Sequence, residues 1–335
     1  MTVRKWIKHV LGVLILAFLL AYLVGHRQEL KALLKLSAGQ LIMMYLLCFL
    51  ISVASVPVVR SLLDALETET GFGDMLILNN AALLLNYAPM KFGTVFRANY
   101  LKRHHGLSYA HFATFFLYIT FLMTLMAAAI GLAVLLGVYG LAGYESKILA
   151  GVFAATVVGS LVFLLIPLPM PKGDGRMSAM LRTFIAGRSQ ISKQRKAVLI
   201  SVVFVVITFV LTALRIGIIY HSMGREMHPA GYLILGALGF VVLFIAITPG
   251  SLGLRELVLA CGAVVLGMPL EVGILAAIID RAITICYAFT AGGACTLWLW
   301  YRSPNNFRKE QDDGKEPKVS DSCGKISGQD NQKRG

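Results

Sequence analysis

The sequence predicts an all-α membrane protein, a polytopic helical bundle, from three observations. Of its 335 residues, 57% are hydrophobic and 14% are charged, whereas soluble domains have about 45–50% apolar and about 25% charged residues. Apolar runs long enough to cross a bilayer recur along the chain. The formal net charge is +14, and the basic residues flank those runs, which is typical of the cytoplasmic side of a membrane protein and argues against nucleic-acid binding.

Several apolar runs approach the ~20 residues that a helix needs to cross the hydrocarbon core. Spans are expected near residues 10–25, 41–59, 111–139, 148–170, 198–220, 230–248 and 272–300. Two shorter runs, 75–88 and 254–267, each adjoin an element that contains Pro and Gly. We expect these two to span the bilayer only in part.

The first apolar run follows a basic start, 1-MTVRKWIKHV-10, and this combination also fits a secretory signal peptide. The small-x-small cleavage pattern is missing after Val24, where the chain continues Gly25-His26-Arg27. We therefore interpret residues 11–24 as a retained first span.

The distribution of Lys and Arg predicts the orientation of the spans. The loop 171–197 has seven basic residues and one acid, whereas the loops 140–147 and 221–229 have one basic residue each. This bias places the N-terminus in the cytoplasm of a multi-pass protein of the inner or plasma membrane, and the basic segment 25–40 is its one poor fit.

The end of the chain is polar and has no apolar periodicity, so we expect a disordered cytoplasmic tail. With both termini in the cytoplasm, the number of crossings is even. About eight are expected, with 254–267 as a short extra crossing. The predicted organisation is a transmembrane domain 1–301, with possible halves 1–170 and 198–301 joined by the basic cytoplasmic loop 171–197, and a tail 302–335.

Two breaks in the apolar pattern match each other: 89-PMKFG-93 and 249-PGSLG-253 are both Pro-x-x-x-Gly, about 160 residues apart. Each leads into an arginine, Arg97 or Arg255. Pro removes a backbone donor and Gly weakens a helix, so a break exposes amides that favour an anion. The candidate backbone residues are Pro89, Gly93, Pro249, Gly250, Ser251 and Gly253. Paired breaks indicate a transporter's binding site in an internal repeat, and the alternative is a tight interfacial turn between two ordinary spans.

Charged residues also occur within the apolar zone. Arg215 lies in one long run, Asp280 and Arg281 lie in another, and Arg255 and Glu256 follow the second break. Internal salt bridges, such as one between Arg255 and Asp280, would reduce the cost of these charges. The arginines outnumber the two acids, and Arg97 adds a fourth cation, so the surplus indicates an anionic partner such as a lipid phosphate. A snorkelling Arg215 near the outer interface is the alternative for that residue.

Most catalytic and cofactor motifs are missing from the sequence. It has no P-loop, no H-E-x-x-H, no G-x-S-x-G and no Asp-x-Asp, so we predict no cofactor, no metal and no ATP-driven step. The cysteines form no CxxC pair, and those in apolar runs (Cys48, Cys261, Cys286 and Cys295) are interpreted as small core residues.

The pair 86-NYAPMKFGTVFRANYLKR-103 and 248-TPGSLGLRELVLA-260, with Arg281 on the last long run, resembles the lysylphosphatidylglycerol synthase transmembrane-region family, also called flippase-like domain proteins. The resemblance covers roughly residues 5–300. It implies a polytopic membrane domain that moves an anionic lipid, either a phospholipid or a polyprenyl-phosphate-linked lipid. Two-part family members carry a soluble transferase domain, whereas about 34 polar residues follow the last span here, so we expect the translocation part alone.

This chain departs from the family pattern in its first half. It has Thr94 where family members often have an acid, and 117-LYITFLMTL-125 where they often have an Arg and an Asp. Both departures leave fewer acids in the first half, so we do not expect the first motif to act as it does in the two-part proteins. The predicted headgroup-binding residues are Asn86, Lys91, Arg97, Arg215, Arg255, Glu256, Asp280 and Arg281.

These observations lead to a flippase-like transporter that binds an anionic membrane lipid. One alternative is a membrane enzyme acting on a lipid phosphate, with Glu256 or Asp280 as general base. Another is an accessory subunit that packs against partner enzymes of glycan or lipid synthesis. Neutralising Arg255 and Glu256 would leave the function of such a subunit intact.

Overall fold

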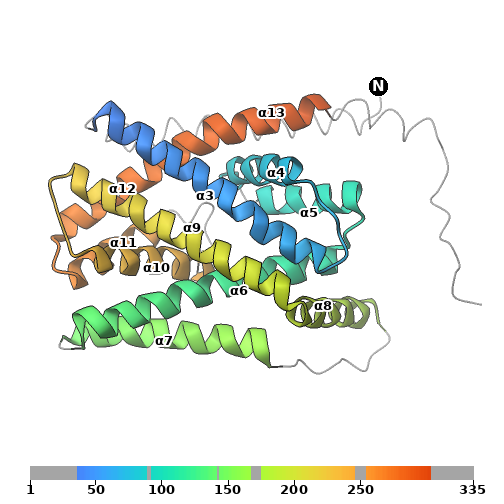
Figure 1. The fold of residues 1–335 in the computed structure, drawn as a ribbon, viewed down its shortest axis with the longest axis horizontal. Coiled ribbons are helices and arrows are strands. Elements are labelled where there is room, and N and C mark those ends of the chain that lie inside the picture. The colour runs from blue at the N-terminus through green and yellow to red at the C-terminus, as the bar shows by residue number, and fades with distance from the viewer. Residues whose placement is uncertain (1–35, 89–91, 142, 167–174, 246–253, 303–335) are drawn as a thin grey trace, which may run out of the picture. The chain divides into compact units, whose positions relative to one another are not determined.

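The computed structural model describes residues 36–88, 92–141, 143–166, 175–245 and 254–302, and their regular structure is helical throughout (Figure 1). The chain divides into two compact units, 1–296 and 297–335. The first unit holds every element discussed below except the end of the last helix. The expected first span, the interpretation of residues 11–24 and the tail beyond 302 lie outside the described residues.

Five helices of the described chain are long and apolar enough to cross a membrane. They are α3 (Ala38–Asp64), α6 (Tyr109–Val134) with the π-helical turn η3 (Leu135–Tyr139), α7 (Tyr144–Leu165), α9 (Arg195–Ser222), and α12 (Leu270–Tyr287) continued by η5 (Ala288–Gly292) and α13 (Gly293–Arg302). Each coincides with a predicted span, which confirms the polytopic helical bundle. α3 and α9 run side by side, and α6 packs against α7 (Figure 1).

Sequence signals fix where two of these helices begin. Ser37 accepts a hydrogen bond from the Gln40 amide, and the Gln40 side chain accepts one from the Ser37 amide, which forms a capping box at α3. Ser108 caps α6 in the same manner through the His111 amide. Both caps satisfy helix amides that would otherwise lack a partner.

The first break connects two short helices that enter and leave the bundle at the same end. α4 (Phe72–Leu85) and α5 (Phe92–His105) pack against each other. A ring nitrogen of His105 lies 3.1 Å from the carbonyl oxygen of Glu69, so the end of α5 returns to the connection that precedes α4. The first short run is therefore re-entrant, as its length predicts.

The second break connects α10 (Pro229–Ile245) and α11 (Leu254–Val265), which enter from the opposite end. Gly231, at the start of α10, lies against the ring hydroxyl of Tyr139, which ends η3. Gly262 of α11 packs on Leu238 of α10, so α11 returns antiparallel to α10, and α12 begins where α11 ends. Neither the predicted span 230–248 nor the expected extra crossing by 254–267 is what these helices show, because α10 and α11 together form one re-entrant pair.

The predicted basic loop 171–197 also differs from the structure. Most of it is a helix, α8 (Arg176–Lys193), and α9 begins at Arg195. The loop prediction followed the density of charge, and it overlooked apolar residues spaced by three or four positions, which form one face of a helix.

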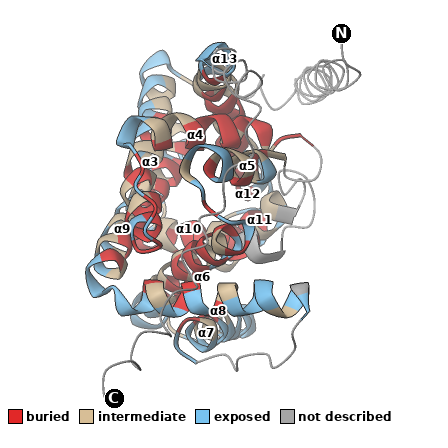
Figure 2. Cartoon of the chain, turned by 90° about the vertical axis from the view of Figure 1, so that its right-hand side faces the viewer, coloured by how far each residue is buried: buried red, intermediate tan, exposed pale blue. Residues whose placement is uncertain are grey.

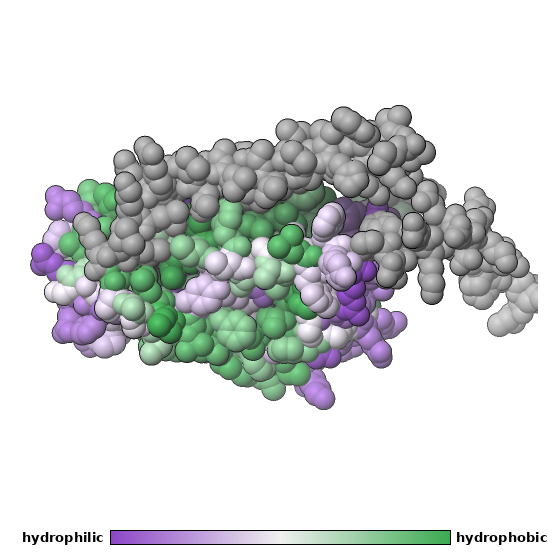
Figure 3. Space-filling view, turned by 90° about the horizontal axis from the view of Figure 1, so that it is seen from above, coloured by the Kyte–Doolittle hydropathy of each residue, from purple (hydrophilic) through white to green (hydrophobic). Residues whose placement is uncertain are grey.

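The hydrophobic core and the lipid-facing surface both consist of apolar side chains. Packing against other helices, and not residue type, therefore decides which of these side chains are buried. Buried apolar side chains form two large clusters, one where α6, α9, α10, α11 and α12 meet and one where α3, α4, α6 and α9 meet, and the buried stretches of these helices are red in Figure 2. The face in Figure 3 has apolar side chains across its middle and polar ones towards both ends. Large apolar side chains such as Leu199 and Val158 are exposed, as expected for helices that face lipid.

Candidate functional site

The centre of the candidate site is α12, which places Asp280 and Arg281 deep in the bundle. Asp280 lies ten residues after the start of α12, or about 15 Å at about 1.5 Å per residue, which is half of a ~30 Å hydrocarbon core. Both residues are buried, with 2% and 3% of their surface exposed. Two adjacent charges at this depth need partners from other helices.

Asp280 pairs with two arginines at once. Its Oδ1 lies 2.8 Å from Nη2 of Arg215 on α9, and its Oδ2 lies 2.8 Å from Nη2 of Arg255 on α11. The predicted bridge between Arg255 and Asp280 is confirmed. The snorkelling alternative for Arg215 is wrong, because its side chain is 8% exposed and paired with Asp280.

Arg281 takes the other carboxylate. Its Nη1 donates to Oε1 of Glu256 over 2.8 Å. Successive residues of α11, a cation and an anion, therefore pair with successive residues of α12. The close packing of the two helices permits these contacts. Gly273 of α12 lies against the Ala260 backbone, where a Cβ atom would come within 2.9 Å of the Ala260 Cα.

Three arginines and two carboxylates give this ion cluster, Arg215, Arg255, Glu256, Asp280 and Arg281, a formal charge of +1. Nε of Arg215 and Oε2 of Glu256 are among its buried atoms that have no hydrogen-bond partner in the described part of the chain. The salt bridges compensate four of the five charges in the cluster. The remaining positive charge is buried in the bundle, where a charge without a counter-ion costs free energy.

The least buried arginine of the cluster stands next to the second break. The Arg255 side chain is 21% exposed, compared with 8% for Arg215 and 3% for Arg281. Arg255 also lies in the first turn of α11, where backbone amides lack partners within the helix. Arg255 is therefore the arginine of the cluster that is most accessible to an anion.

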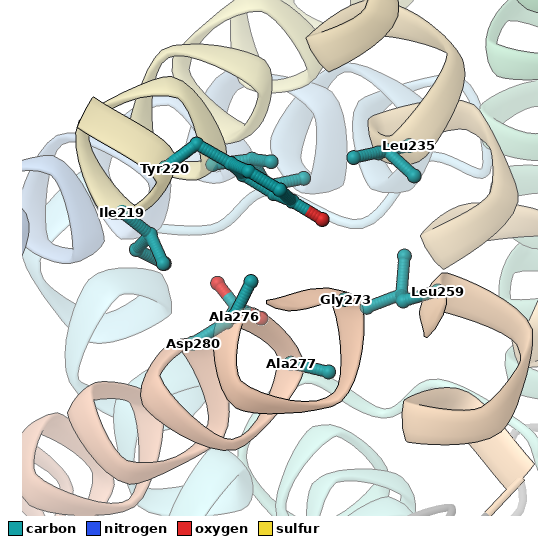
Figure 4. A pocket seen from close by; sticks show the side chains of 9 residues that line it. Ile219, Tyr220, Leu235, Leu259, Gly273, Ala276, Ala277 and Asp280 are labelled. Atoms are coloured by element: carbon teal, nitrogen blue, oxygen red, sulfur yellow. The ribbon is translucent and has the colours of Figure 1, made fainter. Parts of the chain in front are cut away.

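A small pocket adjoins the cluster between α9, α10, α11 and α12. Tyr220 points its hydroxyl into it from α9, and Asp280 lies on the α12 wall among Gly273, Ala276 and Ala277 (Figure 4). The other walls are apolar. The pocket therefore reaches the buried carboxylate of Asp280 between mainly apolar side chains.

A neutral hydrogen-bond network joins the first helix pair to the same long helix. The Tyr287 hydroxyl donates to Oδ1 of Asn80 over 2.8 Å, and the hydroxyls of Tyr45 and Thr290 lie 2.7 Å apart. Sequence analysis missed these residues, because single polar residues in apolar runs resemble ordinary core positions. The signal that could have found them is Asn79-Asn80, two adjacent amides in an apolar run.

The described part of the first break contains close backbone packing. Oδ1 of Asn86 accepts from the Thr94 amide over 3.1 Å, and a Cβ atom on Gly93 would overlap the carbonyl oxygen of Ala82. Arg97 follows on α5, and its buried Nε has no hydrogen-bond partner among the described residues. Among the described residues, Arg97 forms no ion pair with the cluster on α12, and Asn86 bonds to Thr94 instead of to that cluster.

Several predicted site residues lie outside the described residues: Pro89, Lys91, Pro249, Gly250, Ser251 and Gly253. Two cysteines that were expected in the core have distinct positions. Cys48 is buried and accepts a hydrogen bond from Nη1 of Arg215 over 3.1 Å, whereas Cys261 is exposed. The core interpretation of Cys261 is therefore wrong, because α11 turns that side away from α10 and α12.

The comparisons with known proteins agree with the sequence motifs. The family model described as the lysylphosphatidylglycerol synthase TM region matches residues 9–293. This match contains both breaks and all five residues of the ion cluster. The comparisons with curated proteins and with solved structures found no match.

Proposed function

Since the chain belongs to the lysylphosphatidylglycerol synthase TM-region family, we propose that it is a flippase-like transporter that binds an anionic lipid headgroup and moves it across the bilayer. The observation that carries this proposal is the formal charge of +1 on a buried ion cluster. A headgroup phosphate would neutralise that charge and replace its missing solvation.

The roles of the arginines follow from their exposure. Arg255 is the most accessible of the three and follows the break directly, so it binds the phosphate. Arg215 keeps Asp280 neutralised when Arg255 turns to the lipid, because each of them pairs with a different oxygen of that carboxylate. Arg281 holds Glu256 in the first turn of α11. The cluster thus exchanges one internal partner for a ligand without leaving a carboxylate unpaired.

The arrangement of the two short helix pairs also supports transport. The α4–α5 pair enters from one end of the bundle and the α10–α11 pair from the other, and both contact the continuous α12–η5 helix. Broken segments that approach a midplane site from opposite sides are typical of transporters with inverted repeats. Access can then alternate by movement of one pair against α12 while the site stays in place.

The test is leaflet exchange in vesicles reconstituted with the purified protein. Fluorescent phosphatidylglycerol and a fluorescent polyprenyl phosphate are compared with fluorescent phosphatidylcholine, which lacks net charge. We expect exchange of at least one anionic lipid above the protein-free rate. Absence of exchange for both anionic lipids would contradict the proposal.

Arg255→Ala tests the site itself. Asp280 keeps Arg215 in this variant, so the fold should tolerate it. Loss of one charge-assisted contact of about 1.5–3 kcal/mol lowers anionic-lipid exchange by about tenfold or more. Arg225→Ala removes an exposed arginine outside the cluster and is the matched control. Equal exchange rates in the two variants would remove Arg255 from the site while leaving the transport activity standing.

A further inference from the structure

α8 is a helix whose length and charge place it on a membrane and not through one. Its 18 residues approach the length of a span, but it contains four basic residues and no acid. In Figure 2, which looks along α6 and α7 from one end, α8 lies across the view. α8 therefore lies across the direction of α6 and α7 (Figure 2).

Contacts with three spanning helices fix the level of α8. The guanidinium of Arg188 is buried and donates to the carbonyl oxygens of Phe163 and Ile166, where α7 ends. Thr114, in the second turn of α6, donates to the carbonyl oxygen of Phe184 over 3.1 Å. α9 begins two residues after α8 ends. α8 thus lies where α6, α7 and α9 reach the same membrane surface.

The apolar face of α8 has two parts. In the second half of the helix, Ile185 and Ile191 are buried on the bundle. In the first half, the same face continues through Met177, Met180 and Leu181, which are 79%, 48% and 47% exposed. Residues three or four apart share a helix face, so this apolar edge extends beyond the protein at the level of the bilayer surface.

The opposite face of α8 is basic. Arg182 and Lys193 are exposed there, and Arg195 and Lys196 continue the charge into the first turn of α9. Lys102 is also exposed at this end, in the last turn of α5. Acidic side chains at this end belong mainly to the α3–α4 connection, where Glu67 accepts a hydrogen bond from Gln190. Basic side chains above an apolar edge complement an anionic headgroup layer.

We propose that α8 is an interfacial helix that binds the surface of an anionic leaflet. Met177, Met180 and Leu181 enter the boundary between headgroups and acyl chains, and Arg182 and Lys193 contact headgroup phosphates. Arg188 anchors the helix to α7 so that both contacts occur at one depth. This surface is separate from the ion cluster on α12, so the proposal holds whether or not the protein translocates lipid.

The depth of the apolar edge is measured with a polarity-sensitive fluorophore on the full chain in vesicles. Met180→Cys carries the label on the apolar edge, and Ala186→Cys carries it on the opposite, exposed face of the same helix. The wild-type chain, labelled in parallel, supplies the background from native thiols such as Cys261. We expect brominated acyl chains to quench the Met180→Cys label and aqueous iodide to quench the Ala186→Cys label. Equal quenching of both labels by iodide would overturn the membrane contact.

The preference for anionic lipid is measured with the same label. Vesicles of phosphatidylcholine alone are compared with vesicles that also contain phosphatidylglycerol. Phosphatidylglycerol should increase quenching by brominated chains at Met180→Cys, and high salt should reverse the increase. Adding Arg182→Gln and Lys193→Gln to the labelled chain should abolish the increase in quenching that phosphatidylglycerol causes. Adding Arg225→Gln instead should leave that increase unchanged. Quenching that is the same with and without phosphatidylglycerol would overturn the proposed preference of α8 for anionic lipid.

Discussion

The two re-entrant helix pairs have the same arrangement and opposite polar chemistry. α4 and α5 are fixed by neutral contacts, from Asn80 to Tyr287 and from Thr94 to Asn86. α11 instead presents Arg255 and Glu256 to the charges of α12. Neutral hydrogen bonds position a segment without demanding a ligand, whereas an unequal set of buried charges favours a counter-ion. The hydrogen bonds of the first pair therefore position it, whereas the ion cluster of the second pair favours a ligand. Arg97 on α5 is the exception in the first pair, because its buried Nε has no hydrogen-bond partner among the described residues.

The largest expected effect comes from removing the carboxylate of the second pair. Asp280→Asn leaves Arg215 and Arg255 buried without their anion, and breaking a buried ion pair costs about 3–5 kcal/mol. The free energy of unfolding in detergent should fall by that amount. Glu271→Gln, an exposed acid in the first turn of the same helix, is the control. A loss no greater than that of the control would show that the ion cluster does not stabilise the fold.

An intermediate effect is expected where the first pair packs backbone to backbone. Gly93→Ala puts a Cβ atom against the Ala82 carbonyl and 2.6 Å from Oδ1 of Asn86, and such overpacking costs about 1–3 kcal/mol. Gly73→Ala, in α4 with open space around it, should leave the thermal unfolding midpoint nearly unchanged. If both variants unfold at the same temperature, α4 and α5 are not in the close contact described here.

The smallest effect is expected from the neutral network. Tyr287→Phe removes the hydrogen bond to Asn80, which contributes about 0.5–1.5 kcal/mol. Stability measured by denaturant unfolding should fall slightly and should not depend on salt, because no charge is lost. Tyr144→Phe, on an exposed ring, serves as the reference. A loss as large as that of Asp280→Asn would break the distinction between the two pairs.

The prediction from sequence was accurate where a property is local. Five of the predicted long runs are helices in the described part of the chain with nearly the expected bounds, such as 195–222 for the run 198–220, because hydrophobic length largely decides whether a segment suits the bilayer. The bridge from Arg255 to Asp280 was also predicted, since a buried charge without a partner is too costly and few acids were available. The second partner of Asp280 was not, because Arg215 and Arg281 are equally basic in sequence.

The prediction failed where a property depends on which side of a helix faces its neighbours. Charge density concealed α8, although its apolar residues recur at helical spacing. The return of α11 beside α10 depends on Gly262, which lies against Leu238 and Leu235 of α10, and a glycine in the sequence does not show what it approaches. Asn80 and Tyr287 are 207 residues apart, so only folding brings them together.

By itself, the sequence determined that this protein folds in a membrane, the positions of its five described spans, its family motifs and the surplus of cations in its apolar part. Those properties follow from composition and from the length of a helix relative to a bilayer. Only the tertiary structure decided that one carboxylate pairs with two arginines, that the two short helix pairs enter from opposite ends and that α8 lies across the bundle (Figure 2). Partner choice among like charges, and the direction of a short helix, depend on packing between distant segments, which no local pattern encodes.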